Sequence, residues 1–183
     1  GVADFTGSES EVLSGIRQLT NMLAAVCTDC HDDLNRACED MINCKEDTLI
    51  AVSRLADDGI VLEVKENYAK EMVTAFVRLN GMTAGIIANR TKVYDDEMKV
   101  SDEFDGTLTS AGMKKAAKFV NICDAFDIPV VTLTNAAGFK ATVEEEAEIG
   151  MVASKLTYAF ANATVPKVNV IIGKAVGSAY NVM

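Results

Sequence analysis

The chain has 183 residues, 17 basic and 27 acidic, and a formal net charge of −10 at pH 7. This length predicts one domain, or one domain with part of another, and lets the chain bury roughly two-thirds of its unfolded surface. The negative charge repels phosphate backbones and anionic lipids, which argues against nucleic acid and membrane partners. No apolar run reaches the about 20 residues of a membrane-spanning helix and no signal peptide opens the chain, so we expect a cytoplasmic location.

The first half of the chain predicts helices followed by a hairpin. Ser8 and Glu11 have the spacing of a capping box, and apolar residues then recur at intervals of three and four. The pair Asn80-Gly81 between two apolar runs is the strongest hairpin signal in the sequence. In chain order we predict a helix over 9–25, a polar loop or interdomain connection over 28–47, a short helix over 48–55, a turn at 57–59, a strand over 60–64, and hairpin strands over 72–79 and 82–88.

The second half predicts alternating helices and strands. Residues 91–106 are polar and acidic, typical of a loop. A helix should follow the cap candidates at 107–110 and end near Asp127. We then predict an apolar strand over 130–134, a helix over 143–162 and an apolar strand over 168–172. A strand, helix, strand unit makes its two strands parallel, so the turns after them should share one edge of a mixed sheet, where ligands bind in open α/β proteins.

The cysteines suggest metal or haem sites that other features disfavour. Cys27 and Cys30 with His31 match the haem-attachment pattern, and these cysteines with Cys38 and Cys44 could form a zinc cluster. Haem attachment needs an export pathway, and the second cysteine pair is spaced too widely for a zinc ribbon. Reduced thiols in a polar loop are the simpler interpretation, so we expect no metal site. Cys123 falls on an apolar helix face and is expected in the core.

Two glycine turns follow the apolar strands, at Asn135–Phe139 and Gly177–Tyr180. Glycine lets a backbone approach a ligand closely, and free N–H groups at a helix start can stabilise an oxyanion. Ordinary βα turns are the alternative interpretation. Side-chain catalysis is poorly supported because the only histidine, His31, lies in the polar loop, and the chain has no phosphate-binding loop motif. The run Glu144–Glu146 fits an acidic first helical turn better than a metal site.

Segments along most of the chain match one known family in order. They are Asp57-Asp58-Gly59, Tyr68-Ala69-Lys70, Phe76–Gly81, Gly85–Asn89, Lys114–Asn121, Cys123–Pro129, Tyr158–Ala161, Ala163–Val168 and Lys174-Ala175. With these segments the chain resembles the C-terminal domain of biotin-dependent acyl-CoA carboxyltransferases, as in propionyl-CoA and acetyl-CoA carboxylase β subunits and decarboxylase carboxyltransferase subunits. The first turn has Ala-Gly-Phe where the family usually has Pro-Gly-Phe, and the second has Gly-Ser-Ala-Tyr-Asn for the usual Gly-Gly-Ala-Tyr-Asp.

The resemblance implies a crotonase-like (ClpP/crotonase) spiral fold in the α/β class, with a mixed sheet and surrounding helices. It also implies transfer of a carboxyl group between carboxybiotin and the α-carbon of an acyl-CoA, which develops two oxyanions. By the resemblance, the backbone amides of Ser178 and Ala179 stabilise the biotin-side oxyanion, Gly138, Phe139 and Gly177 shape the biotin pocket, and Asn181 tunes substrate choice.

The same resemblance implies partners and a division of the chain. Biotin would be carried on a partner protein or domain, beside biotin carboxylase or decarboxylase subunits, in a homo-oligomer. Residues 1–46 would be the tail of a preceding domain with its connection, and 47–183 an incomplete C-terminal carboxyltransferase domain, truncated at its C-terminus. Half a site at most would lie on the chain, so we expect it to be inactive alone. The alternative is a non-catalytic crotonase-fold assembly subunit or degenerate fragment; a crotonase-type hydrolase would need an acid or base beside the turns.

Overall fold

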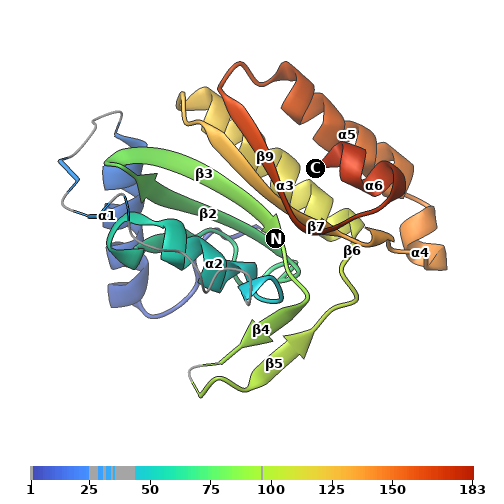
Figure 1. Ribbon diagram of the computed structural model, residues 1–183, viewed down its shortest axis with the longest axis horizontal. Coiled ribbons are helices and arrows are strands. Elements are labelled where there is room, and N and C mark those ends of the chain that lie inside the picture. The colour runs from blue at the N-terminus through green and yellow to red at the C-terminus, as the bar shows by residue number, and fades with distance from the viewer. Residues whose placement is uncertain (1, 25–28, 31, 34, 36–43, 96) are drawn as a thin grey trace.

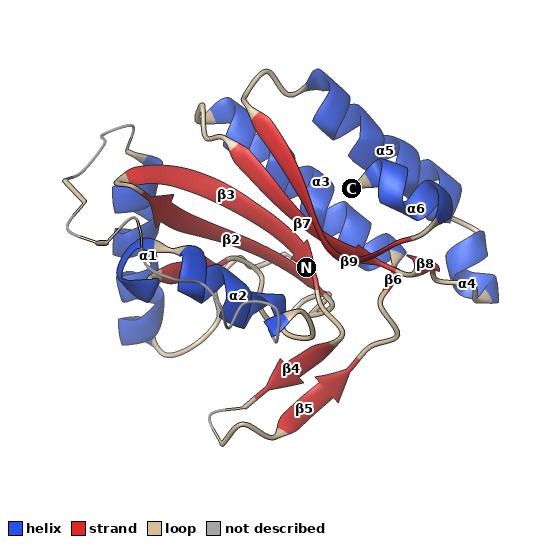
Figure 2. Ribbon diagram, viewed as in Figure 1, coloured by secondary structure: helices blue, strands red, loops and turns tan. Residues whose placement is uncertain are grey.

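The computed structural model describes all residues except 1, 25–28, 31, 34, 36–43 and 96, and is built on a five-stranded sheet. The strand order is β1-β2-β3-β7-β9. The first three strands pair antiparallel, whereas β3, β7 and β9 run parallel (Figure 2). This confirms the predicted mixed sheet. The bounds are β1 Val61–Glu63, β2 Met72–Leu79, β3 Met82–Asn89, β7 Val130–Ala136 and β9 Lys167–Ala175.

Helices cover both faces of this sheet (Figure 1). The alternation of side chains along β2 separates the two cores: Val73, Ala75 and Val77 pack with Val52 of the helix α2 (Thr48–Leu55). Met72 and Phe76 point to the opposite face and pack with α3 (Ser110–Ala125) and α5 (Ile149–Asn162). The first helix, α1 (Glu9–Leu23), joins this second core through Met22.

The predicted N-terminal helices and hairpin are confirmed, although the first helix ends at Leu23, and most of the loop predicted over 28–47 lies outside the described residues. The capping box of Ser8 and Glu11 opens α1, and α2 has the predicted bounds. Strands β2 and β3 form the predicted hairpin in the register Leu79 to Met82. Asn80 and Gly81 have φ values of 53° and 76°, as a tight hairpin turn requires. In the 3₁₀ helix η2 (Asp57–Gly59), the Asp57 carboxylate accepts hydrogen bonds from both turn amides at 2.9 and 2.7 Å, which fixes the turn.

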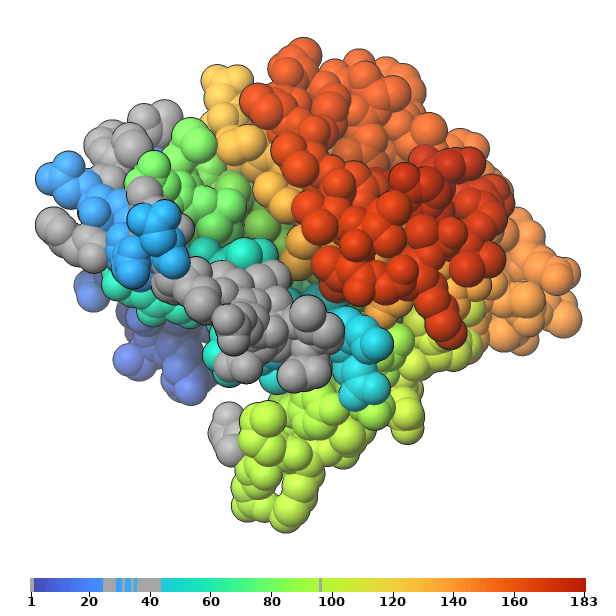
Figure 3. Space-filling model, in the orientation of Figure 1, coloured from blue at the N-terminus to red at the C-terminus, as the bar shows by residue number. Residues whose placement is uncertain are grey.

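The prediction of a loop over 91–106 is wrong, because this segment contains a second hairpin. Strands β4 (Lys92–Tyr94) and β5 (Val100–Glu103) pair antiparallel and project from the body of the molecule (Figures 1 and 3). The turn between them is fixed by the Asp95 carboxylate, which accepts hydrogen bonds from the backbone amides of Glu97 and Lys99. Neither strand has a buried face, so no alternation of apolar and polar residues marked it in the sequence.

The prediction of a single helix over 143–162 is also wrong, because the chain forms two helices there, α4 (Val143–Glu146) and α5. Glu148 interrupts the helix with φ −128° and ψ −13°, and its carboxylate lies 2.7 Å from Lys114 of α3. A tertiary ion pair therefore accompanies a break that periodicity alone did not reveal. The predicted acidic first turn is present in α4, and Val152, Leu156, Ala159 and Ala163 are buried as predicted, with Ile149 packed beside them.

Strand β9 forms an exposed apolar edge of the sheet. Its register with β7 is parallel from Val130 opposite Lys167 onward, which confirms the predicted strand, helix, strand unit. Val168, Val170 and Ile171 are nevertheless 55%, 42% and 51% exposed. An apolar edge strand of this kind is typical of a surface that other structure covers.

Candidate functional site

The structure brings the two predicted glycine turns together at one edge of the sheet. The first turn leads into β8 (Gly138–Phe139), which pairs with β6 (Thr107–Leu108), and the second opens the helix α6 (Gly177–Val182). Helix α6 contacts β8. The backbone amide of Val176 donates to the carbonyl of Ala136 at 3.1 Å, which ties the two turns to each other. The predicted common edge is therefore confirmed.

Both turn glycines face open space. Gly138 has φ 141° and Gly177 has φ 61°, backbone conformations that other residues adopt with strain. A Cβ atom built on either glycine would meet no described atom within 4 Å. The strain of these conformations, and not crowding, therefore favours glycine here, and a ligand can approach the backbone closely at both positions.

The second turn offers the free hydrogen-bond donors. The amides of Gly177, Ser178 and Ala179 belong to the first turn of α6 and have no intrahelical acceptor, and no described residue accepts from them. Ala179 packs its methyl group into the core, which fixes the orientation of this turn. Ser178 and Asn181 are exposed.

The first turn differs from the second, because two of its amides are already hydrogen-bonded within the chain. Ala137 donates to the carbonyl of Gly106 and Lys140 to that of Leu108, both at 2.9 Å. Lys140 also pairs with Asp105, and the hydrogen bond from Lys140 is the main cause that lowers the pKa of Asp105 to about 2. This turn is therefore held firmly and forms a wall of the site, with Gly138 and Phe139 half-buried.

Asn135 links the two turns through its side chain. Its Oδ1 accepts a hydrogen bond from the backbone amide of Lys174 at 2.8 Å, and its Nδ2 donates to the carbonyl of Lys45 at 3.3 Å. Gly173 makes room for this bridge, because a Cβ there would lie 2.6 Å from Asn135 Cγ. The regular pairing of β7 and β9 is interrupted at this point, between Thr134 and Ala136.

A second buried amide, Asn89, extends the sheet beside Asn135. Its Oδ1 accepts from the Asn135 backbone amide at 2.7 Å, and its Nδ2 donates to the Asn135 carbonyl. The side chain thereby replaces one rung of the β3 and β7 ladder. Sequence reasoning missed the roles of Asn89 and Gly173. The only signals were an amide at the end of one apolar strand and a glycine inside another.

A buried group of charges supports the end of β3 next to Asn89. The Arg90 guanidinium lies 3.5 Å from Asp47 and 3.6 Å from Glu63, and Lys115 lies 3.8 Å from the same Glu63 oxygen. Burial raises the pKa of Glu63 and lowers the pKa of Lys115 to about 8. Asp47 also caps α2 through the Leu49 amide, so these charges join α2, β1, β3 and α3.

The metal hypotheses fall largely on residues outside those described, which include Cys27, His31 and Cys38. Among the described residues, no group of three or more His, Cys, Asp or Glu side chains could hold a metal ion. Cys123 is buried in the core as predicted, and burial raises the pKa of its thiol to about 12. None of the helices in the described segments is both long and apolar enough to cross a bilayer.

Known structures place this fold among the crotonase-like carboxyltransferases. The chain superposes with a TM-score of 0.75 on the 12S subunit of transcarboxylase, solved as a hexamer with methylmalonyl-coenzyme A and methylmalonic acid bound. That match has 33% identity and covers 93% of this chain and 33% of the other. The β subunit of geranyl-CoA carboxylase from P. aeruginosa shares the fold, with a TM-score of 0.70 and 24% identity over 94% of this chain and 32% of its own.

Sequence comparison identifies the family. The carboxyl transferase domain family matches residues 1–183, and the chain belongs to this family. It is 36% identical to the propionyl-CoA carboxylase β chain of Sus scrofa over 90% of this chain and 30% of that one. It is 41% identical to the methylmalonyl-CoA carboxyltransferase 12S subunit of Propionibacterium freudenreichii over 72% of this chain and 24% of that one. The chain thus spans about a third or less of the length of these relatives.

Proposed function

We propose that the protein containing this chain transfers a carboxyl group between biotin and an acyl-CoA, and that the second glycine turn stabilises negative charge on the biotin side. The observation that carries this proposal is the set of unbonded amides at Gly177, Ser178 and Ala179, next to open space at the carboxyl edge of β9. Preorganised amides of this kind stabilise developing charge without reorganisation during the reaction.

The residues of the site fit a ring that accepts hydrogen bonds at one oxygen. Biotin, bound to a partner, would supply the carboxyl group from its ureido ring and accept charge on the ureido oxygen. The amides of Ser178 and Ala179 would donate to that oxygen, while Gly177 lets the backbone approach it. Gly138 and Phe139 would form the facing wall, which the bonds of Ala137 and Lys140 hold in place.

The side chain of Asn181 is proposed to influence substrate choice. It is exposed one turn of α6 beyond the donor amides. The assignment rests on the corresponding position of the family motif. We infer from the relatives that the substrate is an acyl-CoA.

The proposed partners follow the assemblies that relatives form. The transcarboxylase 12S subunit assembles as a hexamer, and relatives are chains of propionyl-CoA carboxylase. We propose a homo-oligomer that works with a biotinyl carrier domain and with a biotin carboxylase or decarboxylase subunit. The exposed apolar strand β9 is consistent with assembly. The domain boundary near residue 46 and the cytoplasmic location stay predictions.

A transfer assay on the native protein that contains this sequence tests the proposal. Methylmalonyl-CoA or malonyl-CoA labelled in the carboxyl group is mixed with free biotin, and labelled carboxybiotin is measured. Time-dependent transfer that requires both substrates is expected. Absence of transfer to biotin from either thioester, in protein that is folded and assembled, would favour the non-catalytic assembly subunit, which gains no support from the relatives.

A further inference from the structure

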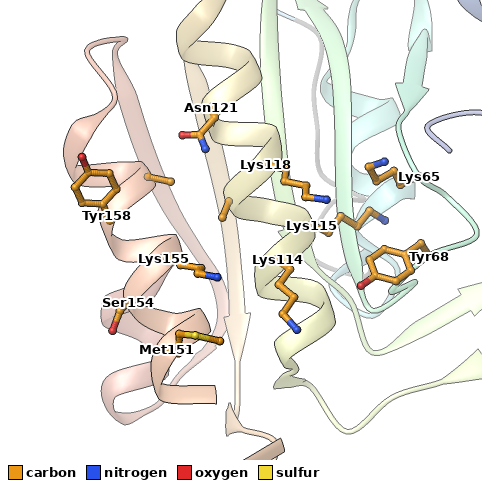
Figure 4. Close-up of a pocket in the computed structure, with 12 residues that line it drawn as sticks. Lys65, Tyr68, Lys114, Lys115, Lys118, Asn121, Met151, Ser154, Lys155 and Tyr158 are labelled. Carbon is orange, nitrogen blue, oxygen red and sulfur yellow. The ribbon is translucent and has the colours of Figure 1, made fainter. Parts of the chain in front are cut away.

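A basic groove lies away from the glycine turns, between the exposed sides of α3 and α5. It has a volume of about 820 Å³ and continues to the segment that carries Lys65 and Tyr68 (Figure 4). Five of the chain's 17 basic residues line it, and no acidic residue of the described segments does. In a chain with net charge −10, this concentration of lysine makes the groove a local attractor for anions. The lysines are Lys65, Lys114, Lys115, Lys118 and Lys155.

Two of these lysines have no counter-charge within the described parts of the chain. Lys114 pairs with Glu148 at 2.7 Å and Lys65 with Asp4 at 2.6 Å. Lys118 of α3 and Lys155 of α5 form no ion pair with any described residue, and both are exposed. Both line the groove: Lys155 points from α5 toward α3, and Lys118 leaves α3 on the side of Lys65 and Tyr68 (Figure 4). A ligand that lies along the groove would therefore meet uncompensated positive charge on two helices.

A third lysine adds an unsatisfied buried donor. Lys115 Nζ is fully buried without a hydrogen-bond partner among the described residues, and its nearest anion, Glu63, is 3.8 Å away and shared with Arg90. Figure 4 shows the Lys115 and Lys118 side chains leaving α3 toward the segment of Lys65 and Tyr68. Lys115 is one of the residues that line the groove, so an anion bound there would supply the partner that its ammonium lacks.

The rest of the lining suits a planar ring. Ala117, Met151 and Ala159 supply apolar surface, and Tyr158 is 70% exposed at the α5 side. The volume lies within the range of about 300–1,000 Å³ typical of small-molecule sites. Lysines bind phosphate as point charges, and an exposed tyrosine ring stacks on a nucleobase.

We propose that the basic groove binds a nucleoside polyphosphate, with Lys118 and Lys155 compensating the charge of its phosphates and with its base against Tyr158. Free ATP and the nucleotide portion of coenzyme A both have this chemistry. An acidic protein segment would also meet the lysines, but the exposed ring at one end of the groove favours the nucleotide.

Calorimetric titration of the native protein with ATP, coenzyme A, adenosine and inorganic phosphate tests this. ATP or coenzyme A should bind saturably, and adenosine and phosphate at least about tenfold more weakly. Because the proposed function also requires an acyl-CoA site, only binding that Lys118→Glu weakens is assigned to the groove. If that binding is tighter for ATP, the groove holds a free nucleotide; if it is tighter for coenzyme A, the groove holds part of the thioester substrate. No saturable binding of either ligand would overturn the proposal and leave an acidic protein segment as the occupant to test.

Variants separate the groove from the glycine turns. Lys118→Glu and Lys155→Glu should each weaken binding about tenfold or more, since each removes a charge-assisted contact. Lys99→Glu makes the same charge change on the exposed β5 hairpin and should leave affinity unchanged. Tyr158→Ala should weaken binding, whereas Tyr158→Phe keeps the aromatic ring and should bind with wild-type affinity. Ser178→Pro should not affect binding in the groove. If Lys99→Glu lost as much affinity as the groove variants, or if only Ser178→Pro lost affinity, the assignment of the binding site to the groove would be refuted.

Discussion

Asn135 Oδ1 accepts a hydrogen bond from the backbone amide of Lys174 at 2.8 Å, and this bond joins the ends of two parallel strands directly before the two glycine turns. Together with the bond from the Val176 amide to the Ala136 carbonyl, this bond holds the two turns in position relative to each other. The residue would contact neither substrate in our proposal, so it is a positioning residue.

Asn135→Ala should lower both stability and carboxyl transfer. The change leaves the Lys174 amide without its acceptor, at a cost of about 1–3 kcal/mol in the free energy of unfolding. Transfer should fall because the donor amides of α6 move relative to β8. Urea unfolding and the labelled transfer assay check the two effects. Asn162→Ala, an exposed asparagine at the end of α5, should change neither.

Gly173→Ala should produce a similar defect by a different route. Its new methyl group would overlap the Asn135 side chain, and overpacking of this kind costs about 1–3 kcal/mol. In an Asn135→Ala background the same change should cost less, because the obstructing atoms are gone. Gly150→Ala is the matched control, since its Cβ meets nothing within 4 Å in an exposed helix and should stabilise by about 0.5–1 kcal/mol. Additive costs in the double variant would contradict the bridge.

Lys115 should make the protein more stable as the pH rises from about 8 to 10.5. Its folded pKa of about 8 lies below the ordinary 10.5, so in this window the unfolded chain binds the extra proton and stability rises with pH. The gain amounts to about 3 kcal/mol across the window. The difference in the free energy of unfolding between wild type and Lys115→Met at each pH isolates the contribution of Lys115. It removes the contribution of Cys123, whose raised pKa lowers stability as the pH rises above about 9.

The exposed Lys118→Met serves as the control for this measurement and should show the pH dependence of the wild type. If the difference in the free energy of unfolding between wild type and Lys115→Met were constant from pH 8 to 10.5, Lys115 would keep its ordinary pKa in the folded state.

Cys123 should resist alkylation until the protein unfolds. Its side chain is buried, and a thiol pKa of about 12 leaves almost no thiolate at pH 8. Iodoacetamide labelling followed by peptide mass spectrometry should show Cys123 modified only in urea concentrations that unfold the chain. Rapid modification of Cys123 under native conditions would contradict its place in the core.

Local patterns predicted those elements whose signals lie in neighbouring residues. The hairpin at Asn80-Gly81 has a turn that only certain residues adopt, and the stripe from Val152 to Ala163 has regular helical spacing. The exposed β4 and β5 hairpin has no buried face to leave a pattern. The break at Glu148 accompanies an ion pair with Lys114, far away in the sequence.

The sequence likewise predicted those parts of the site whose signals lie in neighbouring residues. Glycine turns after apolar strands indicated where ligand-facing backbone would lie, and the parallel pairing placed both turns at one edge. The bridge from Asn135 to Lys174 could not be predicted, because it depends on a missing Cβ at Gly173 in the neighbouring strand. The acceptors that occupy the amides of Ala137 and Lys140 in the first turn likewise lie in a separate segment, at Gly106 and Leu108.

The most direct measurement of the proposed role of the second turn compares Ser178→Pro with Ser178→Ala in the labelled transfer assay. Proline removes one donor amide at a helix position that needs no intrahelical bond, whereas alanine removes the hydroxyl and keeps the amide. Loss of one such donor typically lowers kcat by about 10²–10³-fold. We predict a loss of that size in Ser178→Pro and near wild-type activity in Ser178→Ala. Equal activity of the two variants, whether both high or both low, would contradict stabilisation by the backbone amide.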